Sequence, residues 1–96
     1  MDTTTALPNI NAGSRVRIAK GCKAREIRKG VTAFVQAVEP LGAAFGHEVR
    51  VTLKLLNGFG AGRVVNFYAR HTNRLSDPTV RLNDGNPLHV IEVSRA

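Results

Sequence analysis

The sequence contains few of the residue types on which catalysis, metal binding and disulfide formation depend. Its 96 residues include one cysteine and three histidines. Cys22 alone cannot form an internal disulfide, which fits a reducing compartment, and we expect a cytoplasmic protein. Cys22 and the histidines match no metal-ligand spacing, and no nucleophile lies in a pattern that pairs it with a base. We therefore expect a protein that is not an enzyme and that needs no metal or cofactor.

Long apolar runs and aromatic residues are also scarce. No stretch approaches the roughly 18 apolar residues that a transmembrane helix needs, and the first residues lack the pattern of a secretory signal, so no membrane partner is expected. The chain has no tryptophan, four phenylalanines and one tyrosine. Single-stranded nucleic acids usually stack on several aromatic side chains. We assign Phe34 and Phe67 to the core. Of the others, Phe59 and Tyr68 are the candidates for stacking, and packing or anchoring of a turn is the alternative role of both.

Acidic residues are outnumbered by basic ones. The chain has 14 Lys and Arg residues against 7 Asp and Glu, for a net charge of +7. The excess is uneven, because residues 13–30 contain half of the basic residues and a single acidic one, Glu26. A local positive field attracts polyanions, of which nucleic acids are the commonest. It can also serve an acidic protein partner or simply keep the chain soluble.

What the sequence does contain is a recurring alternation of apolar and polar residues, which is typical of β-strands with one buried face. The alternation is clearest over residues 48–55, where valine and leucine occupy every second position. Apolar residues on both faces of residues 31–39 predict a strand that bends or is covered on both sides. The predicted strands are residues 15–18, 31–39, 48–55, 63–70, 79–82 and 88–93.

Turn signals separate these strands. Asp84-Gly85 predicts a hairpin between the last two strands. Residues 57–62 contain three glycines but lead into a strand rather than a helix, so we expect a hairpin loop and not a phosphate-binding loop. Residues 1–12 lack periodicity and predict a flexible N-terminal tail. Residues 13–96 predict one all-β domain, for which we favour a small antiparallel barrel of five or six strands over a sandwich.

Residues 22–30 break the alternation, and we expect a basic loop with room for one helical turn closed by Gly30. The segment Gly-Ser-Arg-Val-Arg-Ile-Ala-Lys-Gly at 13–21, followed by Lys-Gly-Val-Thr-Ala-Phe-Val at 29–35, resembles the KOW motif of ribosomal proteins and transcription elongation factors. The resemblance covers residues 13–38 and implies a small Src-homology-type barrel. Members of that family commonly bind RNA or contact other proteins of the gene-expression machinery.

Three groups of residues are candidates for ligand contact. The first group lies in the basic loop and at the end of the strand before it, where cations are expected to contact phosphates. It consists of Lys20, Lys23, Arg25, Arg28 and Lys29. The second group is Arg15 and Arg17, on the outer face of the first strand. If the first and third strands lie near each other, Arg50 and Lys54 enlarge this positively charged face. A polar segment near the end of the fourth strand adds Tyr68, Arg70 and Arg74.

These candidates favour one function and leave a second open. The leading prediction is non-enzymatic nucleic-acid binding, RNA ahead of DNA, through phosphate contacts from the basic loop. The alternative is a protein–protein adaptor or a subunit of a larger assembly, because small barrels serve many unrelated functions.

Overall fold

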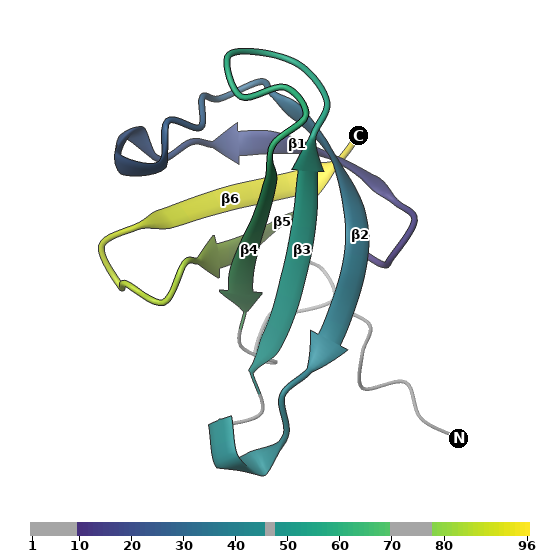
Figure 1. Ribbon diagram of the computed structural model, residues 1–96, viewed down its shortest axis with the longest axis vertical. Helices are drawn as coiled ribbons and strands as arrows, with labels where there is room; N and C mark the ends of the chain where they lie inside the picture. Colours follow the sequence, from purple (N-terminus) through teal and green to yellow (C-terminus); the bar gives the residue numbers. More distant parts are fainter. Residues whose placement is uncertain (1–9, 46–47, 70–77) are drawn as a thin grey trace.

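Six segments with alternating buried and exposed side chains form the strands of one β-sheet, which closes into a barrel (Figure 1). The computed structural model describes residues 10–45, 48–69 and 78–96. The strands are β1 (Arg15–Lys20), β2 (Thr32–Pro40), β3 (Val49–Leu55), β4 (Val64–Ala69), β5 (Thr79–Asn83) and β6 (Val90–Arg95). Two short 3-10 turns, η1 (Lys23–Arg25) and η2 (Ala43–Phe45), lie in the first and second connections.

Each strand pairs antiparallel with its neighbour in the sequence, and β1 also pairs with β6. This closure pairs the backbone groups that an open sheet would leave at its two edges. The pairing of β2 with β3 is the most extensive, from Ala33 opposite Leu55 to Pro40 opposite Val49. Between β4 and β5 the described residues show a single pair, Tyr68 opposite Asn83.

The interior is apolar throughout the described residues, which bury no polar or charged residue. Phe67 is the largest side chain of the core, and Ile10, which precedes β1, is also fully buried. The transfer of each of these large side chains from water to the core contributes about 1.5–3 kcal/mol to the stability of the fold. The strands supply Val16, Ile18, Ala33, Val35, Val49, Val51, Leu53, Leu55, Val65, Phe67, Ala69, Val80, Leu82, Ile91 and Val93.

A bulge explains why β2 carries apolar residues on both faces. Val35 lies opposite Leu53 and Ala37 lies opposite Thr52, so Gln36 is the extra residue on β2. An extra residue reverses the alternation. Val35 points inward before the bulge, and Val38, opposite the buried Val51, packs against the core after it. The apolar residues on both faces of this strand are thus explained by a bulge, which was not expected from the sequence.

The predicted all-β barrel is confirmed, with six strands whose ends lie within two residues of the expected ones. The helical turn expected in the basic loop is η1, but Glu26 ends it and not Gly30. The turn η2 was not expected. Leu88 was predicted to begin the last strand, but it lies in the turn before β6 and is 86% exposed. Of the predicted tail, residues 1–9 lie outside the described residues. None of the described helical segments is long and apolar enough to span a membrane.

Candidate nucleic-acid interface

Three connections meet at one end of the barrel, which we call the loop end. They are residues 21–31 between β1 and β2 (the basic loop), residues 56–63 between β3 and β4, and residues 84–89 between β5 and β6. The guanidinium Nη2 of Arg63 donates a hydrogen bond to the carbonyl oxygen of Arg25, at 2.6 Å. The Nε atom of Arg25 lies 3.5 Å from the carboxylate of Asp84. The three connections are thus joined to one another by polar contacts.

The basic loop is anchored in the core by two of its own residues. Cys22 and Ile27 are buried and form a small antiparallel bridge, with N–H···O distances of 2.9 and 3.1 Å in the two directions. Gly21 permits this closure, because a Cβ atom there would lie 2.2 Å from the carbonyl oxygen of Ile27. The residues between the two anchors, including η1, are therefore held at the surface in a defined conformation.

Glu26 ends η1 in a backbone conformation that is unusual for its residue type. Its φ angle of 57° lies in the left-handed region, and it is the one non-glycine residue with a positive φ among the described residues. Such a conformation costs of order 1 kcal/mol for a residue with a Cβ atom. The hydrogen bonds of Cys22 with Ile27 on either side of the turn hold it in place.

Asp84 joins the basic loop to the β5–β6 turn. Its carboxylate accepts a hydrogen bond from the N–H of Asn86 at 3.1 Å and lies 3.0 Å from Nδ1 of His89. The side chain is 10% exposed. Burial acts to raise the pKa of Asp84, but the hydrogen bonds from Asn86 and His89 and the charges of His89 and Arg25 outweigh it, so the pKa lies below its usual 3.8. Asp84 therefore holds Arg25 as an ionised partner.

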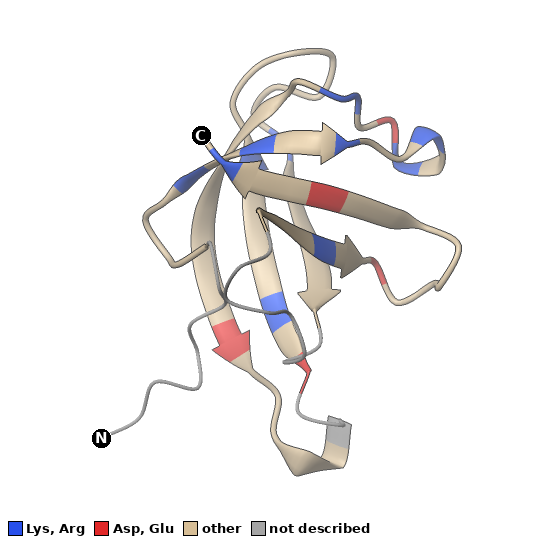
Figure 2. Cartoon of the chain, turned by 180° about the vertical axis from the view of Figure 1, so that it is seen from behind, with Lys and Arg blue, Asp and Glu red and all other residues tan. Residues whose placement is uncertain are grey.

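Arg50 and Lys54 lie on β3, which β2 separates from β1. The predicted phosphate-binding residues of β1 and the basic loop divide into one tethered cation and six exposed ones. Arg25 is partly buried and faces Asp84, so it serves the loop's structure. The others are exposed, and the described residues place no carboxylate in an ion pair with any of them. Figure 2 shows Lys and Arg residues along β1 and the loop that follows it. We call these six the basic surface: Arg15, Arg17, Lys20, Lys23, Arg28 and Lys29.

Of the third predicted group, only Tyr68 falls within the described residues, and it lines a different groove. Arg70 and Arg74 lie outside the described residues. Tyr68 is half-buried and lines a separate groove of about 500 Å³ with Arg50 and Asn83. Arg50 forms an ion pair with Glu39 at 3.0 Å, and two further carboxylates line the groove, from Glu48 and Asp84.

The assignment of Phe34 to the core was wrong, whereas that of Phe67 is confirmed. Phe34 is partly exposed, and its partners across the sheet are Arg15 on β1 and Lys54 on β3. The buried residues on either side of it in the strand, Ala33 and Val35, require its side chain to point outward. An aromatic ring thus lies on the outer face of the sheet between two cations.

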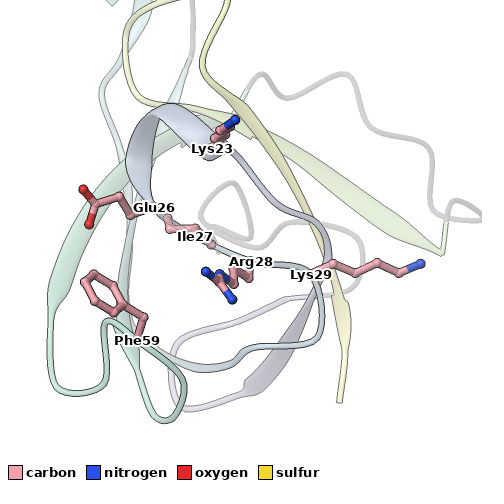
Figure 3. A pocket seen from close by; sticks show the side chains of 6 residues that line it. All are labelled: Lys23, Glu26, Ile27, Arg28, Lys29 and Phe59. Atoms are coloured by element: carbon pink, nitrogen blue, oxygen red, sulfur yellow. The ribbon is translucent and has the colours of Figure 1, made fainter.

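A groove opens between the basic loop and the β3–β4 connection. It has a volume of about 450 Å³ and is lined by Lys23, Glu26, Ile27, Arg28, Lys29 and Phe59. Phe59 forms one wall, and the guanidinium group of Arg28 points toward its side of the hollow (Figure 3). This groove combines an exposed aromatic ring with three residues of the basic surface. The sequence identified these residues, but not that Phe59 lies opposite the basic loop.

The described residues contain no cluster of three or more His, Cys, Asp and Glu side chains that could hold a metal ion. Comparison of the chain with protein-family models, curated proteins and solved structures finds no match. The geometry and charge of the loop end are therefore the basis on which function is inferred.

Proposed function

We propose that this chain is a non-enzymatic nucleic-acid-binding protein that holds its ligand by the phosphates at the loop end of the barrel. The observation that carries the proposal is the basic surface, whose six cations are exposed and have no ion-pair partner among the described residues. Cations that are not neutralised from within the protein keep their field for an external polyanion. Phosphate contacts of this kind supply affinity and orientation but no sequence specificity.

RNA is the favoured ligand over DNA. The support is the resemblance of residues 13–38 to the KOW motif, whose members commonly bind RNA. The barrel fold is compatible with that resemblance but does not decide function. A direct comparison of RNA and DNA ligands is therefore part of the test.

The test is a fluorescence-anisotropy titration with short single-stranded RNA, duplex RNA and duplex DNA at several salt concentrations between about 50 and 200 mM. The variant replaces Lys23, Arg28 and Lys29 together by Gln. Each lost phosphate contact should lower the slope of log affinity against log salt by about 0.7 for a single strand or 0.9 for a duplex. Arg25 is left in place, because its replacement would also release the loop from Asp84.

A control variant replaces two cations, Arg81 and Arg95, by Gln; they are exposed on β5 and β6 and do not line the groove. We expect the control to bind with nearly wild-type affinity and salt slope. Wild-type affinity of the Lys23, Arg28 and Lys29 variant would refute the proposal, as would absence of binding by the wild type at the lowest salt concentration.

A second candidate is a protein-docking module, favoured by the exposed apolar side chains of the loop end. Phe59 is 78% exposed, and Leu88, in the neighbouring β5–β6 turn, is 86% exposed. Sedimentation analysis over a range of concentrations tests it. Self-association that Leu88→Ser abolishes would favour docking, whereas a concentration-independent monomer that binds RNA would leave nucleic-acid binding as the function.

A further inference from the structure

Phe59 is held in solvent by an ordered loop. Its connection is closed by hydrogen bonds from the N–H of Gly62 to the carbonyl of Leu55, at 2.7 Å, and from the N–H of Thr32 to Oδ1 of Asn57, at 3.0 Å. Arg63, at its end, is tied to the basic loop. The ring is nevertheless 78% exposed, although burial of a phenylalanine is among the most favourable steps of folding. An aromatic ring fixed in this way is available to a ligand.

The wall opposite Phe59 offers both apolar and cationic groups. Ile27 supplies an apolar floor, and Arg28 supplies a planar guanidinium group that can stack on an aromatic ring. Lys23 and Lys29 lie at the margin of the groove, and their side chains point away from its centre (Figure 3). A ligand with a flat apolar ring and a negatively charged backbone matches this arrangement.

We propose that the groove holds one unpaired base of a single-stranded nucleic acid, stacked on Phe59, with its flanking phosphates on Lys23, Arg28 and Lys29. This inference rests on the proposed function and specifies the form of the ligand. A base in a duplex is already stacked between its neighbours and cannot enter the groove without being flipped out. Single strands should therefore bind more tightly than duplexes of equal charge.

Glu26 lines the same groove, and its carboxylate lies on the side of Phe59 (Figure 3). A carboxylate among phosphate-binding cations weakens the attraction for the backbone, and its conformation is itself unfavourable. Both costs are explained if the carboxylate accepts a hydrogen bond from the exocyclic amino group of the bound base. Glu26 would then select bases with an exocyclic amino group, cytosine and adenine among them, over uracil, whose edge presents a single imide N–H between two carbonyl oxygens that repel the carboxylate.

The experiment measures the binding of labelled oligomers of cytidine, adenosine and uridine and of an RNA duplex by anisotropy. We expect the wild type to prefer cytidine and adenosine oligomers to uridine oligomers, and all single strands to the duplex. Phe59→Ala should weaken single-strand binding about 5- to 100-fold. Val64→Ala, which shortens an exposed apolar side chain on β4 outside the groove, should leave binding unchanged.

Glu26→Gln separates base recognition from simple repulsion of phosphate. If Glu26 reads the base, this variant should bind uridine oligomers more tightly and cytidine and adenosine oligomers no more tightly, so that the preference shrinks. An equal gain for all three oligomers would overturn the role of Glu26. Thermal melts of each variant check that the barrel remains folded.

Failure of this inference is distinct from failure of the proposed function. Salt-dependent RNA binding that Phe59→Ala leaves intact would retain the function and overturn the stacked base. Tighter binding to the duplex than to single strands would do the same. Binding of a poly-glutamate peptide at least as tight as that of RNA, and weakened by Phe59→Ala, would assign the groove to an acidic protein partner instead.

Discussion

Replacement of Gly21 by Ala tests how the basic loop is held. Gly21 has no positive φ, so the expected effect is steric and not a matter of backbone preference. The added Cβ atom would lie 2.2 Å from the carbonyl oxygen of Ile27 and 3.0 Å from the backbone of Arg28 and Lys29. These contacts are with backbone atoms, which cannot rotate away as a side chain can. The loop must therefore move outward from the barrel.

The expected loss of folding free energy follows from the contacts that this movement breaks. The two hydrogen bonds between Cys22 and Ile27 contribute about 1 kcal/mol each. Partial exposure of Ile27, which is 3% exposed in the native state, adds about 1 kcal/mol or more of the roughly 1.5–3 kcal/mol of its burial. The sum is about 3 kcal/mol, which for a domain of this size lowers the melting temperature by about 12–24 °C. The barrel should remain folded at room temperature, because total stabilities are typically about 5–15 kcal/mol.

The assay uses the single cysteine of the chain as a reporter. Cys22 is 8% exposed, so its thiol should react slowly with a thiol-specific reagent in the wild type and much faster in Gly21→Ala. Gly13→Ala is the matched control: its Cβ atom meets nothing within 4 Å, but its φ of 89° makes alanine unfavourable. The Gly13→Ala variant should melt at a lower temperature than the wild type, and its Cys22 should still react slowly with the reagent. An unchanged melting temperature of Gly21→Ala, with Cys22 still protected, would show that close packing at Gly21 does not hold the loop.

Two further predictions concern Asp84 and the two faces of the sheet. Asp84→Asn should destabilise the protein by about 1–2 kcal/mol at neutral pH. Because the pKa of Asp84 is lowered in the folded state, its charge stabilises the fold above pH 3.8, and this contribution is lost as the pH falls below that value. Melts of wild type and variant should therefore converge in acid; a constant difference would contradict the charge effect. Phe67→Ala should lower the free energy of unfolding by about 3–5 kcal/mol, whereas Phe34→Ala should lower it by less than about 1 kcal/mol. Denaturant unfolding measures both values, and equal losses would place Phe34 in the core.

The strands were predictable because the side chains themselves carry the information. A strand buries every second residue, so β3, with apolar residues at Val49, Val51, Leu53 and Leu55, has one favourable way to face the core. The hairpin at Asp84-Gly85 was predictable for a similarly local reason, since Gly85 adopts a positive φ of 96°. Both signals lie within a few residues of the structure that they specify.

The position of Phe34 depends on a contact that no short segment contains. The bulge at Gln36 is set by the register between β2 and β3. Before the bulge the inward residues are Ala33 and Val35, so the larger Phe34 points outward. Size and hydrophobicity alone favour the opposite assignment, which is why sequence reasoning placed Phe34 in the core.

The candidate site was only partly predictable for the same reason. The charge of the basic loop is evident from the sequence, but the partner of Arg25 is Asp84, in a turn between two other strands. Phe59 likewise reaches the groove through the β3–β4 connection. These pairings follow from barrel closure, which brings distant connections to one end.

The conformation of the basic loop itself argues against a role in solubility alone. Solubility depends on net charge, and charges on a mobile loop would serve it equally well. This loop is instead held by the buried Cys22 and Ile27, by a glycine with no space for a side chain, and by Glu26 in the left-handed region. Fixing cations close together raises their mutual repulsion, which destabilises the protein unless an anion is bound. A loop backbone that holds its cations in one arrangement is what the proposed nucleic-acid ligand, whose backbone charges are regularly spaced, would require.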